Sequence, residues 1–134
     1  MADLTFPEGL HYSAEHEWVA RTDDESVVRV GITDYAQDSL GDVVFVDMPD
    51  VGDTVTAGES SGEVESTKSV SDLIAPVSGD VVTVNESLED SPETINSDPY
   101  SGGWIYEVRL SDPAEVDALM DSAAYRAAVE SEGA

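Results

Sequence analysis

Hydrophobic and polar residues alternate along much of the chain, with the period expected of half-buried β-strands. In the segment Val27–Ile32, residues Val28, Val30 and Ile32 share one face, and Trp104–Leu110 repeats the pattern near the C-terminus. Short apolar or alternating runs at 18–20, 43–48, 62–66, 70–74 and 80–84 predict further strands. Pro49 closes the run 43–48, and Ala75-Pro76 ends the run 70–74. The pattern therefore predicts a mainly β protein.

Helix signals are few and lie between or after these strands. Thr33 is expected to cap a short helix over 34–40, which Gly41 ends. A second short helical segment is expected to start at 91–93. Ser111 or Asp112, followed by Pro113, predicts a C-terminal helix. Its apolar stripe is expected to pack on the sheet and consists of Val116, Leu119, Met120, Ala123 and Ala127.

Two similar segments flank the middle of the chain. Gly52–Glu59 and Gly79–Glu86 are offset by 27 residues and share five of eight residues. Two similar strand units on either side of a short turn predict a barrel or sandwich with internal two-fold pseudo-symmetry. The hairpin between them, with arms at 62–66 and 70–74, then lies where the two halves meet.

The composition adds an unusual charge to this picture. Thirty acidic residues against five basic ones give a formal charge of −25, although 40% of the residues are hydrophobic. Molar salt shortens the Debye length to about 3 Å and screens such repulsion, so the charge indicates a high-salt cytoplasm. Nucleic acids and anionic membranes are excluded as partners by the same charge.

Several other classes of protein are excluded by what the sequence lacks. There is no cysteine, hence no disulfide or thiol chemistry, and the N-terminal residues show no signal-peptide pattern. No apolar run reaches the length of a membrane span. The expected protein is one cytoplasmic domain over 1–134.

Lys68 is the only lysine in the chain, and the other basic residues are Arg21, Arg29, Arg109 and Arg126. Arginine replaces lysine for surface charge but is not readily acylated, so one retained lysine points to a use for its primary amine. Lys68 falls on the predicted hairpin turn, where a modifying enzyme can reach it. A group attached there by an amide would be carried on a long tether, as in biotin and lipoamide carriers.

Two enzymatic interpretations fit the sequence poorly. Gly58–Gly62 matches the Gly-x-Ser-x-Gly pattern of hydrolases, but that pattern needs a following helix and a later histidine, and both histidines come earlier. His11 and His16 lack a third clear ligand for a metal, so no metal site is expected. The expected protein is a carrier and not an enzyme.

Six ordered segments of the chain together resemble the glycine cleavage H-protein family of lipoyl carriers. The segments are Glu15–Trp18, Gly31–Gln37, Leu40–Val46, Val64–Ser69, Pro76–Gly79 and Asn96–Trp104. The resemblance covers about residues 10–130 and implies a flattened barrel-sandwich hybrid, like other lipoyl domains, with short helices and a C-terminal helix. The acidity and lysine scarcity depart from typical members and point to a halophilic archaeal source.

The resemblance also implies a function and its partners. Lipoic acid is expected as an amide on Lys68, where it carries the aminomethyl group of glycine from the pyridoxal-phosphate glycine decarboxylase to the tetrahydrofolate-dependent aminomethyltransferase. Dihydrolipoyl dehydrogenase then reoxidises the arm. Glu17 and Asp72 are expected to hold the loaded arm, and Glu65 and Ser66 to be recognised by the lipoate-attaching enzyme. A monomer is expected.

Two other carrier functions stay open at this stage. A biotin carrier has a similar fold, but its lysine usually lies between methionines, whereas Thr67 and Ser69 flank Lys68 here. An H-like protein that passes lipoate to other proteins, without glycine decarboxylation, is not distinguished by the sequence.

Overall fold

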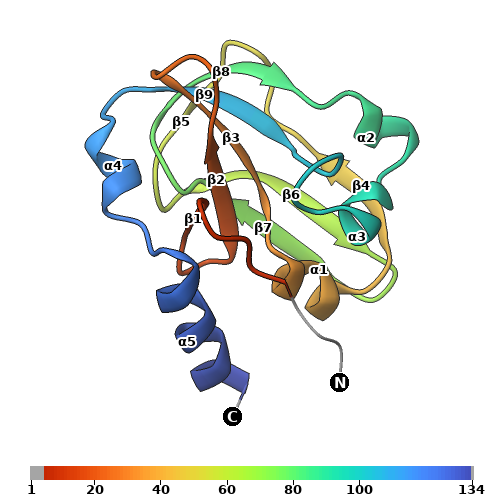
Figure 1. Ribbon diagram of the computed structural model, residues 1–134. Coiled ribbons are helices and arrows are strands. Elements are labelled where there is room, and N and C mark those ends of the chain that lie inside the picture. Colours follow the sequence, from red (N-terminus) through yellow and green to blue (C-terminus); the bar gives the residue numbers. More distant parts are fainter. Residues whose placement is uncertain (1–4, 134) are drawn as a thin grey trace.

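The computed structural model describes residues 5–133 as two antiparallel β-sheets that face each other, with short helices at their margins (Figure 1). The six-stranded sheet has the order β1-β2-β3-β9-β8-β5 and the three-stranded sheet the order β4-β6-β7. The strands are β1 (His11–Tyr12), β2 (Glu17–Arg21), β3 (Val27–Ile32), β4 (Val43–Asp47), β5 (Thr54–Val55), β6 (Ser60–Ser66), β7 (Val70–Ile74), β8 (Gly79–Val84) and β9 (Tyr106–Leu110).

This architecture confirms the predicted fold class. The main core lies between the sheets and is rich in valine from both, as alternating strands require. No barrel closes among residues 5–133, because the two-residue strands β1 and β5 end the larger sheet without pairing to the smaller one. The two similar segments pair with each other where β5 meets β8, through Thr54 opposite Asp80 and Val55 opposite Gly79.

The first helix forms as its sequence predicts. α1 (Asp34–Leu40) starts at Thr33, whose side chain accepts a hydrogen bond from the Ala36 amide, and ends at Gly41 with a φ of 85°. Such a φ favours glycine. Two more short helices, α2 (Ser87–Asp90) and α3 (Thr94–Ser97), follow β8, and only the second of them is predicted.

The predicted C-terminal helix is present, but it does not run unbroken from Pro113. The chain forms α4 (Ala114–Asp117) and α5 (Ser122–Gly133), and between them Met120 pairs its backbone with Tyr12 of the edge strand β1. Asp121 then caps α5 through a hydrogen bond from the Ala124 amide.

The buried face of α5 also differs from the predicted stripe. Tyr125 and Val129 are buried with Phe6, Tyr12 and Trp18 in a second cluster, while Ala123 and Ala127 are exposed. Burying a tyrosine and a valine removes more apolar surface from water than burying two alanines. No helix within residues 5–133 is long and apolar enough to cross a membrane.

Candidate functional site

Lys68 lies at the tip of the β6–β7 hairpin, and its side chain is exposed. The turn is fixed by Ser66, whose hydroxyl oxygen accepts hydrogen bonds from the amides of Lys68 (3.3 Å) and Ser69 (3.1 Å). The Ser66 amide donates to the Ser69 carbonyl at 2.8 Å. Such a bonded turn presents the lysine at a defined place while leaving its amine accessible.

The α1–β4 loop supports this hairpin from the side. The Thr67 amide donates to the carbonyl of Asp42 at 3.0 Å. The Lys68 chain passes over Gly41, where a Cβ would come within 3.2 Å of Lys68 Cε. Gly41 therefore serves two purposes, a left-handed backbone and a close approach by the lysine.

Asn96 of α3 holds that loop in place, a role that the sequence analysis does not predict. Its amide nitrogen donates to the Gln37 side chain (3.0 Å) and the Gly41 carbonyl (2.9 Å), and its side-chain oxygen accepts from the Val43 amide (2.8 Å). A chain of hydrogen bonds thus runs from α3 through the loop to the hairpin. The only sequence signal is that Asn96 belongs to a segment that carries the family resemblance.

A cleft of about 360 Å³ lies beside the lysine hairpin, and Ser69, Val70 and Ser71, which follow Lys68 in the chain, line part of it. Its lining combines the ends of β2 and β3, helix α1 and the start of β7: Glu15, His16, Glu17, Ile32, Tyr35, Ala36, Ser39, Leu40, Val64, Ser69, Val70 and Ser71. The aliphatic side chains give it an apolar wall, and Glu17 adds an ionisable group. Mostly apolar clefts with a few polar groups are typical ligand sites.

Glu17 is the most perturbed carboxyl at this cleft. Only 2% of its surface is exposed. Burial raises the pKa of Glu17 to about 8. The hydrogen bond that the Ser13 hydroxyl donates to Glu17 at 2.6 Å lowers this pKa, but by less than burial raises it. Its carboxyl is therefore largely neutral at pH 7 and would ionise readily beside a cation.

His16, the residue before Glu17, links the cleft to the C-terminal helix. Its backbone has a φ of 73°, which is uncommon for a residue with a side chain. His16 Nδ1 is hydrogen-bonded to the Tyr125 hydroxyl at 2.8 Å, and that hydroxyl also bonds Thr33 Oγ1 at 2.7 Å. Helix α5 thus fixes one wall of the cleft.

The other predicted site residues are less close to the cleft. Asp72 is exposed on β7 and is not among the lining residues; strand alternation places its side chain on the face opposite Ser71 and Leu73. Glu65 is exposed beside the lysine turn, whereas Ser66 is buried and its hydroxyl bonds the turn. Recognition of both residues by the lipoate-attaching enzyme stays a prediction. The structure thus brings Glu17, but not Asp72, to the cleft. No group of His, Asp and Glu in the described part of the chain has the arrangement of a metal site.

Known proteins with similar sequence and structure are glycine cleavage proteins. The chain is 60% identical over 121 residues to the glycine cleavage system H protein of Micrococcus luteus, which covers 90% of this chain and 94% of that protein. It is 61% identical over 130 residues to that of Mycobacterium avium, covering 94% and 96%. A crystal structure of the Mycobacterium marinum H protein superposes with a TM-score of 0.81 at 50% identity, covering 90% of this chain and 95% of that one.

These relatives are bacterial, so they do not support the expected archaeal source. The family model for the glycine cleavage H-protein matches residues 10–132, which include the lysine hairpin, the cleft and most of α5. Its extent and the high identities show that this chain belongs to the glycine cleavage H-protein family.

Proposed function

We propose that this protein is the lipoyl carrier of a glycine cleavage system, with lipoic acid joined as an amide to Lys68. The observation that carries the proposal is the lone lysine on a rigid, exposed hairpin tip in a chain of this family. The amide forms when the Lys68 amine attacks the carbonyl carbon of an activated lipoyl group such as lipoyl adenylate. AMP leaves with the bonding electrons, and the nitrogen loses a proton to solvent.

The protein is a single cytoplasmic carrier domain over 1–134 and a monomer, without catalysis of its own. Its arm visits glycine decarboxylase, the aminomethyltransferase and dihydrolipoyl dehydrogenase in turn, after a lipoate-attaching enzyme has loaded Lys68. The chain positions the arm, and the enzymes supply the chemistry.

The cleft beside Lys68 fits a docking site for the loaded arm. Its apolar wall suits the hydrocarbon part of the arm, and Glu17 suits a protonated amine at its end. An arriving ammonium group would displace the proton of Glu17, leaving a carboxylate–ammonium pair out of water. Asp72 lies on the outer face of β7 and is the weaker of the two expected docking residues.

Spontaneous release of the carried aminomethyl group tests the docking. Glu17→Gln keeps the size of the side chain but cannot ionise, so release should be about tenfold faster, the loss expected for one charge-assisted hydrogen bond. Asp72→Asn should have a smaller effect, and the exposed, distant Glu130→Gln none. Release from Glu17→Gln at the wild-type rate would remove Glu17 from the docking site.

A reconstitution tests the function itself. Lipoylated protein with glycine decarboxylase should support exchange of labelled bicarbonate into the carboxyl group of glycine, while the unmodified protein should not. A lipoylated protein that is inactive in exchange, yet gives its lipoyl group to other carrier proteins in the presence of a transferase, would favour the lipoate-transfer function. Biotin on Lys68 in native protein would favour the biotin carrier.

A further inference from the structure

The outer face of the three-stranded sheet carries an ordered pattern next to Lys68. Phe45 of β4 lies opposite Glu65 of β6, and Glu65 lies opposite Val70 of β7. All three side chains are exposed, whereas Val64, the residue before Glu65 on β6, is buried in the core between the sheets. These residues form a first row across the sheet, at the end where the lysine turn begins.

The two ends of the first row, Phe45 and Val70, are apolar on a surface dominated by acids. Phe45 and Val70 are each 55% exposed. Large hydrophobic residues exposed within 5–133 are Val44, Phe45, Val51 and Val70, and three of these four lie on the strands that form or flank the lysine hairpin. Aromatic residues are enriched at protein interfaces, so an exposed phenylalanine in this position indicates a contact surface.

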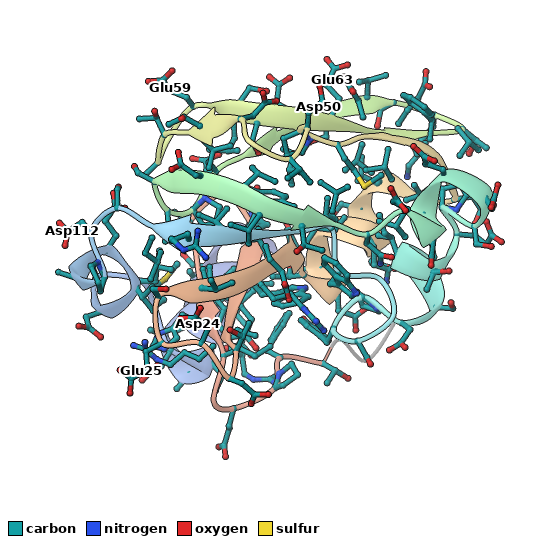
Figure 2. All side chains as sticks on the ribbon, turned by 90° about the horizontal axis from the view of Figure 1, so that it is seen from above. Asp24, Glu25, Asp50, Glu59, Glu63 and Asp112 are labelled. Atoms are coloured by element: carbon teal, nitrogen blue, oxygen red, sulfur yellow. The ribbon has the colours of Figure 1, made fainter. Side chains whose placement is uncertain are left out.

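A second row follows two residues along each strand, at a spacing of about 7 Å. Asp47 lies opposite Glu63, and Glu63 lies opposite Asp72; all three are exposed. In Figure 2, where this sheet is the uppermost layer, Glu63 projects away from the body of the molecule. Strands β4, β6 and β7 contain no basic residue. Carboxylates directly opposite one another repel, and a basic partner surface would relieve that repulsion.

We propose that these two rows form the docking surface for the enzyme that acylates Lys68. This inference rests on the proposed function. Such an enzyme must enclose the Lys68 amine, so its body covers surface next to the hairpin, and the inner face of this sheet is already buried in the core. The partner accordingly has an apolar contact for Phe45 and Val70 and a basic strip that lies over Asp47, Glu63 and Asp72.

The test uses unmodified protein, a purified lipoate–protein ligase, ATP and lipoate, with initial rates followed by intact mass. Phe45→Ser should raise KM about tenfold, the loss of one interface anchor, with kcat changed less than twofold. Val51→Ser is the matched control, since Val51 is equally exposed but lies outside this sheet. Because these side chains are exposed, the variants should melt within a few degrees of the wild type.

A charge test addresses the second row. Asp47→Asn, Glu63→Gln and Asp72→Asn together should raise KM about tenfold and reduce its dependence on salt. Asp23→Asn, Glu25→Gln and Glu130→Gln together make the same change in net charge at exposed acids elsewhere. This control triple should keep the wild-type KM.

Competition separates docking from chemistry. The Lys68→Arg protein cannot be acylated but keeps the surface, so it should inhibit lipoylation of the wild type competitively. Adding Phe45→Ser to Lys68→Arg should weaken that inhibition about tenfold. Unchanged KM values and undiminished competition by the double variant would overturn the docking surface while leaving the function intact. A wild type that the ligase leaves unmodified would overturn the function, and this inference with it.

Discussion

At the scale of single residues, ionisation of the buried Glu17 carboxyl destabilises the fold. Its carboxyl is buried beside Ser13, and burial raises its pKa from 4.5 to about 8. Between these two values the folded protein keeps a proton that the unfolded chain has released. The contribution of this protonated carboxyl to the free energy of unfolding is fully present below about pH 4.5. It is lost as the pH rises through 8.

Replacing Glu17 by glutamine should therefore stabilise the protein at higher pH. The free energy of unfolding of Glu17→Gln should exceed that of the wild type by on the order of 2–4 kcal/mol at pH 8, and by little at pH 5. Urea unfolding at a series of pH values measures the difference. Glu15→Gln, an exposed neighbour, should show no such trend, and a parallel pH dependence of Glu17→Gln and wild type would contradict the buried proton.

The sequence identifies Lys68 but not the state of Glu17. Lys68 is singled out by a lysine count and a turn pattern, and both can be read from the sequence without knowing any tertiary contact. Whether Glu17 is buried depends on β2 pairing with β3 and on β6 and β7, which supply other residues of the cleft lining; no local pattern contains these long-range contacts. Asn96 is missed for the same reason, since its partners lie more than fifty residues earlier in the chain.

At the scale of elements, the lysine hairpin depends on a helix from another part of the chain. Asn96 in α3 bonds the α1–β4 loop, and the carbonyl of Asp42 in that loop receives the Thr67 amide. We expect loss of Asn96 to loosen the turn beside Lys68 more than it loosens the sheets.

Asn96→Ala should cost about 1–3 kcal/mol of stability, because it leaves partly buried backbone groups without partners. The Thr67 amide should also exchange with solvent faster under native conditions. Asn85→Ala is the matched control: Asn85 bonds the carbonyls of Gly102 (2.9 Å) and Trp104 (2.7 Å), away from the hairpin. Hydrogen exchange followed by NMR decides the matter; equal Thr67 protection in both variants would show that Asn96 does not position the turn.

Local signals predict some elements well and others poorly. Val27–Ile32 and the helix 34–40 form as expected, because alternation and the Thr33 cap act within a few residues. The C-terminal helix is interrupted because Met120 bonds the edge strand β1, a contact over more than one hundred residues. Tertiary pairing overrides helix pattern there.

At the scale of the whole molecule, charge is the dominant feature. Acidic side chains project from opposite sides of the fold, as the labelled Asp24, Glu63 and Asp112 show in Figure 2. Within the described chain Arg29 pairs with Glu107 at 2.9 Å and Arg21 with Asp117 at 3.4 Å, far too few partners for thirty acids. Self-repulsion should therefore weaken the fold in dilute buffer.

Salt should stabilise the protein by screening this repulsion. Raising monovalent salt from about 0.1 M to 1 M shortens the Debye length from about 10 Å to 3 Å and should raise the melting temperature by on the order of 10 °C. Calorimetry in sodium chloride and in potassium chloride should give the same rise. A constant melting temperature across that range would show that the net charge of −25 does not limit stability.

Attachment of a lipoyl group to Lys68 is tested by intact-mass analysis of protein isolated from its native host. The wild type should carry a single lipoyl adduct and Lys68→Arg none, since arginine keeps the charge but cannot be acylated. Peptide mapping should place the adduct on the 62–74 hairpin. Wild-type protein without an adduct, or an adduct that persists in Lys68→Arg, would show that Lys68 is not the lipoyl attachment site.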